Sequence, residues 1–144
     1  MSAFLWLFVI FLGIAFGAGL YESRVVVPLW TSAPPGSLAA PDAGRRFWAW
    51  ITTGPLTLLT IANLVAALQS SGPGRAWWLT AALVTLAERG ATFGYFIPTI
   101  IRLGRQTHSD STLLLALKRW VRLNYVRNAM TLVAWIAALR VMSL

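Results

Sequence analysis

The chain has 144 residues, of which 58% are hydrophobic and only 11% are charged. This balance lies well outside that of soluble domains and predicts an integral membrane protein. The absence of cysteine excludes disulfides and thiolate metal sites. Lys and Arg number 12 against 4 Asp and Glu, an excess that membrane topology explains, so no nucleic-acid partner is expected.

The apolar segments predict an all-α fold, a single domain over residues 1–144 in which four transmembrane helices form an antiparallel bundle. Each crossing of a hydrocarbon layer about 30 Å thick uses about 20 residues. The four spans are expected at about 3–22, 47–69, 76–101 and 120–142. The last helix begins near Thr112, so its first turns are expected in or below the headgroups. Pro55 and Pro98 lie inside spans and predict kinks, which can open a cavity or merely bend a helix.

Proline, glycine and polar residues mark the connections between these spans. Four prolines between residues 25 and 44 break the helical pattern, so this segment is expected to be a loop that can contain a short interfacial helix. The sequence SSGPGR at 70–75 predicts a tight turn. A polar loop at 102–111 precedes the last helix, which Ser109 or Ser111 can cap.

The basic residues predict the orientation, because cytoplasmic loops collect Lys and Arg. Eight of them lie at the two longer loops: Arg24, Arg45, Arg46, Arg102, Arg105, Lys118, Arg119 and Arg122. Only Arg75 and Arg140 flank the opposite side. Both termini are therefore expected on the non-cytoplasmic side, and the chain is expected among the lipids of a bacterial cytoplasmic (inner) membrane.

Polar residues within apolar spans are expected to face the interior of the bundle. In the last helix they follow steps of four, three, one and three along one helix face: Trp120, Asn124, Arg127, Asn128 and Thr131. Arg127 then requires an anion at similar depth. Glu22, at the inner end of the first span, is the first choice by depth, and Glu88 in the third span is the second.

The third span contains two adjacent charges, Glu88 and Arg89. Glu88, Thr92 and Tyr95 share one helix face, whereas Arg89 points about 100° away. This spacing predicts that the two charges do not simply neutralise each other side by side. Glu88 and Tyr95 are expected to face a polar interior cavity. Arg89 is expected to turn toward another helix or a neighbouring subunit, which would make the protein a homo-oligomer.

Two interpretations of the intramembrane polar residues stay open. They can be interhelical hydrogen bonds that fix the register of the bundle, which we favour for any single Asn or Thr. They can also form a site, which we favour for Glu22, Glu88 and Arg127, because ionisable groups within a membrane usually mark one. Asn63, in the second span, is expected to share the interior cavity with these three residues.

Glycines, tryptophans and the single histidine indicate packing and membrane position more than chemistry. Gly13 and Gly17 form a G-x-x-x-G step that lets another helix approach closely. Tryptophans at span ends are typical of an aromatic belt: Trp48, Trp50, Trp77 and Trp78. His108 lies in a loop, so a metal or haem site built on histidine is not expected.

Two stretches carry a resemblance to a known family. They are GLYESRVVVPLW at 19–30 and RWVRLNYVRNAMTLVAWIAAL at 119–139. With four spans, the chain resembles the anthrone-oxygenase-like family of small four-helix membrane proteins in nearly its whole layout. The residues specific to the resemblance are Gly19, Pro28, Trp30, Trp120, Asn124 and Arg127. It implies oxygenation of an anthrone-type aromatic substrate to a quinone, with no metal, flavin or other cofactor.

The resemblance also implies roles for the intramembrane residues. Glu22 or Glu88 would be the base that deprotonates a small hydrophobic substrate, and Arg127 would stabilise the resulting anion. Substrate contacts are expected from Trp30, Trp48, Asn63, Tyr95, Trp120, Asn124 and Asn128. Among these, the tryptophans can stack on aromatic rings. The amides and the tyrosine hydroxyl can orient oxygens.

Two other classes of function remain. The chain can be a binding or transport protein for an apolar ligand, lipid or quinone, although residues 3–20 lack the acidic residue that small proton-coupled exporters tend to carry. It can also be an accessory membrane subunit whose polar residues only hold helices together.

Overall fold

The computed structural model describes residues 3–39 and 47–144. All regular secondary structure in these residues is helical. The first helix comprises α1 (Ala3–Tyr21), η1 (Glu22–Val26) and α2 (Val27–Trp30), and η2 (Gly36–Ala39) is a short turn after it. The second comprises η3 (Trp48–Thr53) and α4 (Gly54–Gln69). The third comprises α5 (Arg75–Ala91), η4 (Thr92–Phe96) and α6 (Ile97–Gly104), and the fourth is α7 (Ser111–Met142).

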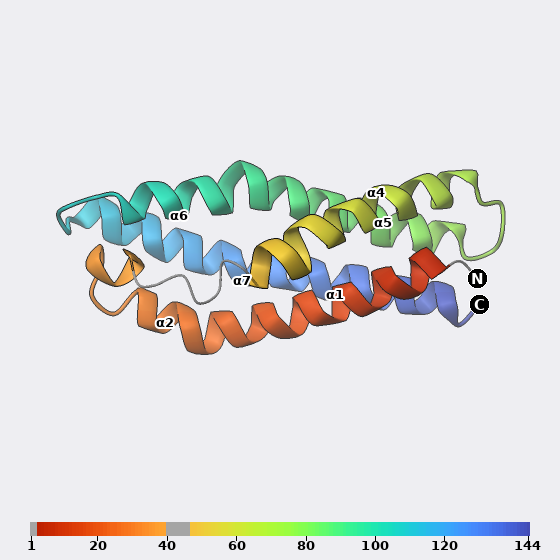
Figure 1. The fold of residues 1–144 in the computed structure, drawn as a ribbon, viewed down its shortest axis with the longest axis horizontal. Coiled ribbons are helices and arrows are strands. Elements are labelled where there is room, and N and C mark those ends of the chain that lie inside the picture. Colours follow the sequence, from red (N-terminus) through yellow and green to blue (C-terminus); the bar gives the residue numbers. More distant parts are fainter. Residues whose placement is uncertain (1–2, 40–46) are drawn as a thin grey trace.

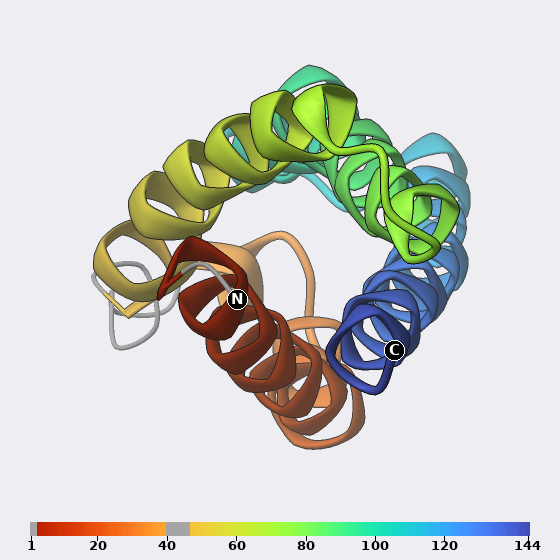
Figure 2. The same cartoon turned by 90° about the vertical axis from the view of Figure 1, so that its right-hand side faces the viewer.

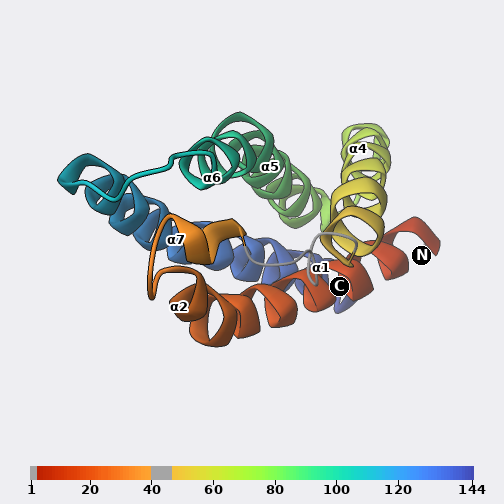
Figure 3. The ribbon, with the colours of Figure 1, turned by 60° about the vertical axis from the view of Figure 1, so that its left-hand side comes forward.

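The four helices surround a common axis in the order α1, α4, α5 and α7, and each packs against its two neighbours in this ring (Figure 2). Both termini and the turn between α4 and α5 lie at one end of the molecule (Figure 1). The loop between α6 and α7 lies at the other end. Helix α4 crosses α1 steeply, as Figure 3 shows. The predicted antiparallel order of four helices is therefore present.

Three of the four helices contain a π-helical turn that ends two residues before a proline. These turns are η1 before Pro28, η3 before Pro55 and η4 before Pro98. A proline has no N–H to donate, and its ring clashes with the carbonyl four residues earlier. A wider turn on the N-terminal side relieves this clash while the chain stays helical. The prolines therefore explain the π-helical turns, and the predicted distortions at Pro55 and Pro98 take this form.

The prediction that a loop begins near residue 25 is wrong. The first helix continues from Ala3 to Trp30 without a break. Pro28 occupies the first turn of α2, where its missing N–H is not needed, and η1 absorbs the steric clash. Two residues that the loop prediction also used, Pro41 and Gly44, lie outside the described residues, as do Arg45 and Arg46 from the orientation argument.

The ends of the last two helices lie close to their predicted positions. The third helix extends to Gly104, three residues beyond the predicted end of the span. The fourth begins at Ser111, and its cap is Asp110, whose carboxylate accepts a hydrogen bond of 2.7 Å from the Leu113 amide. The prediction that Ser109 or Ser111 caps this helix is therefore wrong. An ionised carboxylate is a strong acceptor for an unpaired N–H at a helix start.

Helices α1 and α7 approach closely at two glycines. A Cβ atom at Gly13 would lie 3.1 Å from the Trp135 ring, and one at Gly19 would lie 2.5 Å from Asn128 Oδ1. A Cβ at Gly17 would meet nothing within 4 Å. The predicted close packing is real, but Gly13 and Gly19 provide it and Gly17 does not.

Many polar side chains are buried and many large apolar side chains are exposed, which is unlike a soluble bundle. One apolar cluster includes Leu5, Phe8 and Leu12 against Leu56, and another, of Leu103, Leu113 and Leu117, lies beside the α6–α7 loop. Further along the helices many buried side chains are polar or charged, including Thr52, Thr85, Glu88, Arg89, Thr92, Asn124 and Asn128. Large apolar side chains are exposed on all four helices, among them Trp6, Ile10, Leu58, Val65, Leu83, Phe93, Val126 and Ile136. Two helices, Ala3–Trp30 and Trp48–Gln69, are long and apolar enough to cross a membrane.

Candidate functional site

The buried charges in the third helix form a two-point ion pair. Arg89 Nε lies 2.6 Å from Glu88 Oε2, and Arg89 Nη2 lies 2.8 Å from Glu88 Oε1. Thr92 Oγ1 donates a third hydrogen bond of 3.0 Å to the same carboxylate. Glu88 and Arg89 are 2% and 6% exposed, so water does not screen this pair.

The prediction that these adjacent charges do not neutralise each other is therefore wrong. The two Cα–Cβ bonds diverge by about 100°, as helical geometry requires. The arginine side chain is long enough to bend back around the helix, so its planar fork still meets both carboxylate oxygens. Arg89 consequently does not need a partner from another subunit, and the expectation of an oligomer loses its basis.

Arg127 on α7 is held less tightly than Arg89. Its Nε lies 3.8 Å from Glu88 Oε1, and its Nη1 donates a hydrogen bond of 3.3 Å to Thr92 Oγ1. The guanidinium carbon lies 4.6 Å from the centre of the Phe96 ring, within the range of a cation–π contact. Glu22 acts on Arg127 electrostatically at longer range. Glu88, the second choice from the sequence, is thus the carboxylate within ion-pair distance of Arg127, and Glu22, the first choice, acts on it from farther away.

Glu22 opens the π-helical turn η1 and is buried. The Trp48 side chain, at the start of η3, donates a hydrogen bond to the Glu22 carboxylate. Two widened turns from different helices therefore meet at this carboxylate. Arg127 is the cation whose charge acts on it. Glu22 thus differs from Glu88, because no guanidinium fork grips both of its oxygens in the described residues.

Ser23 links the first helix to the polar face of α7. Its Oγ accepts hydrogen bonds from Asn124 Nδ2 at 3.0 Å and from Asn128 Nδ2 at 2.7 Å. Asn128 Nδ2 also donates to the Gly19 carbonyl at 3.1 Å. Sequence reasoning missed Ser23. The available signal was its spacing of four from Gly19, which puts a small residue and a hydroxyl on one helix face.

Aromatic rings close the site toward the end that carries the α6–α7 loop. Trp120 donates from Nε1 to the Phe96 carbonyl at 3.1 Å, and its ring meets Phe96 edge-on with centres 5.7 Å apart. Trp30 lies 6.4 Å from Trp120, and Tyr95 meets Phe96 edge-on at 5.0 Å. Three of the residues predicted to contact substrate, Trp30, Tyr95 and Trp120, therefore lie together, with Phe96 as a member that the sequence did not indicate.

Asn63 lies apart from this group. Its Oδ1 accepts a hydrogen bond of 3.0 Å from Trp78 Nε1, and its Nδ2 donates to the carbonyls of Phe4 and Leu59 at 3.1 and 2.8 Å. These partners lie toward the end that holds the termini. Asn63 therefore ties α4 to α1 and α5, and the expectation that it shares a cavity with Glu22 and Arg127 is not met.

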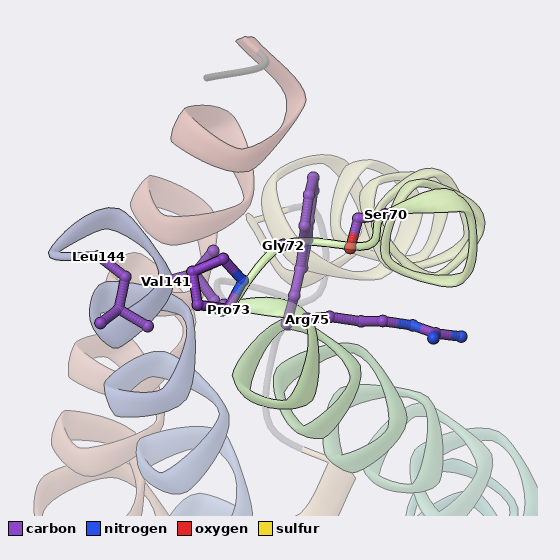
Figure 4. Close-up of a pocket in the computed structure, with 8 residues that line it drawn as sticks. Ser70, Gly72, Pro73, Arg75, Val141 and Leu144 are labelled. Atoms are coloured by element: carbon purple, nitrogen blue, oxygen red, sulfur yellow. The ribbon is translucent and has the colours of Figure 1, made fainter.

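Two pockets lie at opposite parts of the bundle. One, of about 210 Å³, lies between the α4–α5 turn and the end of α7, and Arg75 extends away from Val141 and Leu144 there (Figure 4). The other, of about 250 Å³, lies between the third helix and α7, and Arg127 is one of its lining residues. Only the second pocket adjoins the buried charges.

The chemistry of the site follows from its donors and acceptors. The carboxylates of Glu22 and Glu88 and the guanidinium of Arg89 are buried, and the Arg127 side chain beside them is 14% exposed. Among the described residues, buried Arg89 Nη1 and Asn124 Oδ1 have no hydrogen-bond partner. Such atoms mark a place for a water or a polar ligand atom. The described residues contain no group of three or more His, Cys, Asp or Glu that can hold a metal ion.

Comparison with protein-family models, with curated proteins and with solved structures finds no match to this chain. Its function is therefore inferred from the residues themselves.

Proposed function

We propose that the chain is an integral membrane protein of four spans. All four helices expose large apolar side chains, whereas the charged groups in their central parts are buried. In α7 the only charged residue between positions 123 and 139 is Arg127, a stretch of about 25 Å at 1.5 Å per residue. This length is close to the hydrocarbon thickness of a bilayer.

The exposed basic residues support an orientation with both termini outside the cytoplasm. Six of them belong to η1, α6, the α6–α7 loop or the first half of α7: Arg24, Arg102, Arg105, Lys118, Arg119 and Arg122. These segments lie toward the end with the α6–α7 loop (Figure 1). Arg75 and Arg140 lie toward the end that carries the termini. Cytoplasmic ends of spans are the more basic ones, so the α6–α7 loop faces the cytoplasm.

Within this bundle we infer a cofactor-independent oxygenase that acts on a small hydrophobic aromatic or quinone-type substrate. The reaction converts an acidic ring CH2 group to a carbonyl. One atom of dioxygen enters that carbonyl and the other leaves as water. Glu22 removes the proton, because no arginine of the described residues holds its carboxylate in a fork, and Arg127 stabilises the anion that then meets dioxygen.

The other residues of the site have supporting roles. Glu88 positions Arg127 rather than acting as a base, since Arg89 and Thr92 occupy both of its oxygens. The orphaned Asn124 amide oxygen is available to orient a polar group of the substrate. Trp30 and Trp120 provide aromatic surface.

One observation carries this proposal. Arg127 is paired only loosely with Glu88, and it interacts electrostatically with Glu22, which lies beyond ion-pair distance. This interaction takes place inside a largely apolar bundle. A general base and an anion-stabilising cation are the two groups that the reaction needs.

The test is dioxygen uptake by the protein in vesicles supplied with anthrone, measured against empty vesicles. Glu22→Gln and Arg127→Gln should each lower the protein-dependent rate by about a hundredfold or more. Arg122→Gln, an exposed arginine on the same helix, is the matched control and should keep the rate. Unchanged uptake in Arg127→Gln protein that is still folded would refute the assignment.

A second candidate is ligand binding without turnover, as in a transport protein or an accessory subunit. The observation in its favour is that Ser23, Asn124 and Asn128 join α1 to α7 by hydrogen bonds of an ordinary interhelical kind. This candidate predicts ligand retention with no dioxygen uptake above that of empty vesicles.

A further inference from the structure

The pocket between the third helix and α7 is an apolar groove of about 250 Å³. The two helices line it with Ala91, Tyr95, Phe96, Leu123, Val126 and Met130. Arg127 also lines the groove, but only with the aliphatic part of its side chain, because the accessible lining contains no polar surface. A polar group would find no hydrogen-bond partner there, so the groove accommodates hydrocarbon.

The groove extends along α7 and is open on the side of the bundle. Leu123 and Met130 are seven residues apart, which corresponds to about 10 Å at 1.5 Å per residue. Val126, between them, is 53% exposed. In the proposed four-span bundle this side faces lipid, and acyl chains are the hydrocarbon available to fill the groove. A segment of one acyl chain lying along the helices matches its length and its chemistry.

An arginine lies beyond the groove on each of the two helices that line it. Arg119 precedes Val126 by seven residues, and Arg102 follows Tyr95 by seven residues. Seven residues are about two helical turns, so each arginine lies near the helix face that lines the groove and about 10 Å closer to the α6–α7 loop. Both arginines are exposed.

The packing of the two helices puts these arginines at similar levels. Trp120 Nε1 donates its hydrogen bond to the Phe96 carbonyl on one side of them. On the other side, an apolar cluster is formed by Leu103, Leu113 and Leu117. Along both helices, the arginine lies between these two contacts.

The chain offers these two guanidinium groups little negative charge. The only acidic residue between positions 97 and 122 is Asp110, whose carboxylate caps α7. A negatively charged group from outside the chain therefore complements Arg102 and Arg119. In a bilayer, the phosphate of a lipid headgroup lies at the level where the hydrocarbon ends and thus where the acyl chain in the groove would begin.

We propose that the groove binds an acyl chain of one anionic phospholipid from the cytoplasmic leaflet, and that Arg102 and Arg119 hold the phosphate of this lipid. The inference rests on the four spans of the proposed function and does not depend on the oxygenase reaction.

The test is photolabelling in phosphatidylcholine vesicles with two lipid probes, each with a diazirine in the middle of one acyl chain. One probe is phosphatidylglycerol, which is anionic, and the other is phosphatidylcholine, which has no net charge. On illumination the diazirine loses dinitrogen, and the resulting carbene inserts into a neighbouring C–H bond. Tryptic peptides 90–102 and 123–127 contain groove residues, whereas peptides 1–24 and 76–89 contain none and are the internal controls.

The anionic probe should label the groove peptides about fivefold more strongly than the neutral probe, or more, because each basic residue near the surface attracts an anionic lipid. The control peptides should show no such preference. Even labelling of groove and control peptides by both probes would reject the lipid site and keep the four spans. Absence of label from all four peptides would reject the four-span bundle as well.

Two variants of the third helix test the groove. Ala91→Phe fills it and should lower labelling of peptide 123–127 by both probes by about fivefold. Ala87→Phe adds the same ring about one turn earlier, at an exposed position outside the groove lining, and should leave the labelling unchanged. Equal labelling in the two variants would overturn the proposal.

Two exposed arginines test the charge and keep the experiment decisive if Ala91→Phe does not fold. Arg119→Gln should lower the preference of peptide 123–127 for the anionic probe by about fivefold and leave its labelling by the neutral probe in place. Arg24→Gln removes the same charge from η1 of the first helix and should keep the preference. An equal preference in these two variants would refute the phosphate contact. Specific labelling together with absent dioxygen uptake would keep the lipid site and reject the oxygenase.

Discussion

The contact between Gly19 and Asn128 makes the stability of the bundle sensitive to a single methyl group. In Gly19→Ala protein the new Cβ would lie 2.5 Å from Asn128 Oδ1 and 3.3 Å from its Cγ. Asn128 cannot simply rotate away, because its Nδ2 is bonded to the Gly19 carbonyl and to Ser23 Oγ. Either both hydrogen bonds break or α1 and α7 move apart.

The loss of stability in Gly19→Ala can be worked out for each of these two responses. Overpacking a tight contact costs about 1–3 kcal/mol. An interhelical hydrogen bond in a membrane protein contributes about 0.6 kcal/mol on average, so losing two costs about 1 kcal/mol. Both routes therefore destabilise Gly19→Ala by about 1–3 kcal/mol. Gly17→Ala is the matched control, because its Cβ meets nothing within 4 Å while its gain in helix propensity is the same.

The assay is unfolding by sodium dodecyl sulfate in mixed micelles, followed by circular dichroism and tryptophan fluorescence. The free energy of unfolding of Gly19→Ala should lie below that of Gly17→Ala by the amount above. Adding Asn128→Ala to Gly19→Ala should remove most of the steric clash. The effects of the two substitutions on the free energy of unfolding should therefore not be additive. Equal stability of the two alanine variants would refute the close contact.

Three further predictions concern other contacts. Arg89→Ala should destabilise the protein by about 3–5 kcal/mol in the same unfolding assay, because it leaves the Glu88 carboxylate buried without its closest cation. Arg102→Ala, at an exposed position, is the control and should change stability by no more than about 0.5 kcal/mol. Asn63→Ala should cost about 1–3 kcal/mol and alter tryptophan emission, since it leaves the Trp78 indole N–H without its acceptor. Pro98→Ala restores a backbone N–H donor and should let η4 become an ordinary α-helical turn. Amide hydrogen exchange over residues 92–98 should then be slower. Unchanged exchange would show that the proline does not cause the π-helical turn.

The number and order of the helices could be predicted from the sequence because they depend on the spacing of apolar runs and turn residues. The turn at 70–74 and the long last helix are examples. Pro28 misled the prediction because a proline can be accommodated in two ways, by ending a helix or by widening the turn before it. Packing against neighbouring helices decides between these outcomes, and local sequence does not contain that information.

The candidate site could be predicted in part. The inward face of the last helix follows from its periodicity, and Asn124 and Asn128 are indeed buried there. The pairing of Glu88 with Arg89 could not be obtained from Cβ directions, since it depends on the bent conformation of a long side chain. Ser23 was missed because its one signal, the spacing of four from Gly19, is a single helical step and does not by itself mark a polar face.

The adjacency of Glu88 and Arg89 has a consequence for biosynthesis. Their ion pair requires only one helix, so it can form as soon as the third segment becomes helical. A nascent segment with paired charges meets a lower barrier to leaving the translocation channel for lipid than one with separate charges. Arg127 lies in a later segment than Glu88, so in the proposed four-span bundle the carboxylate is already in place when Arg127 is made. The order of synthesis thus provides Arg89 and Arg127 with the Glu88 carboxylate before or as each of them is made.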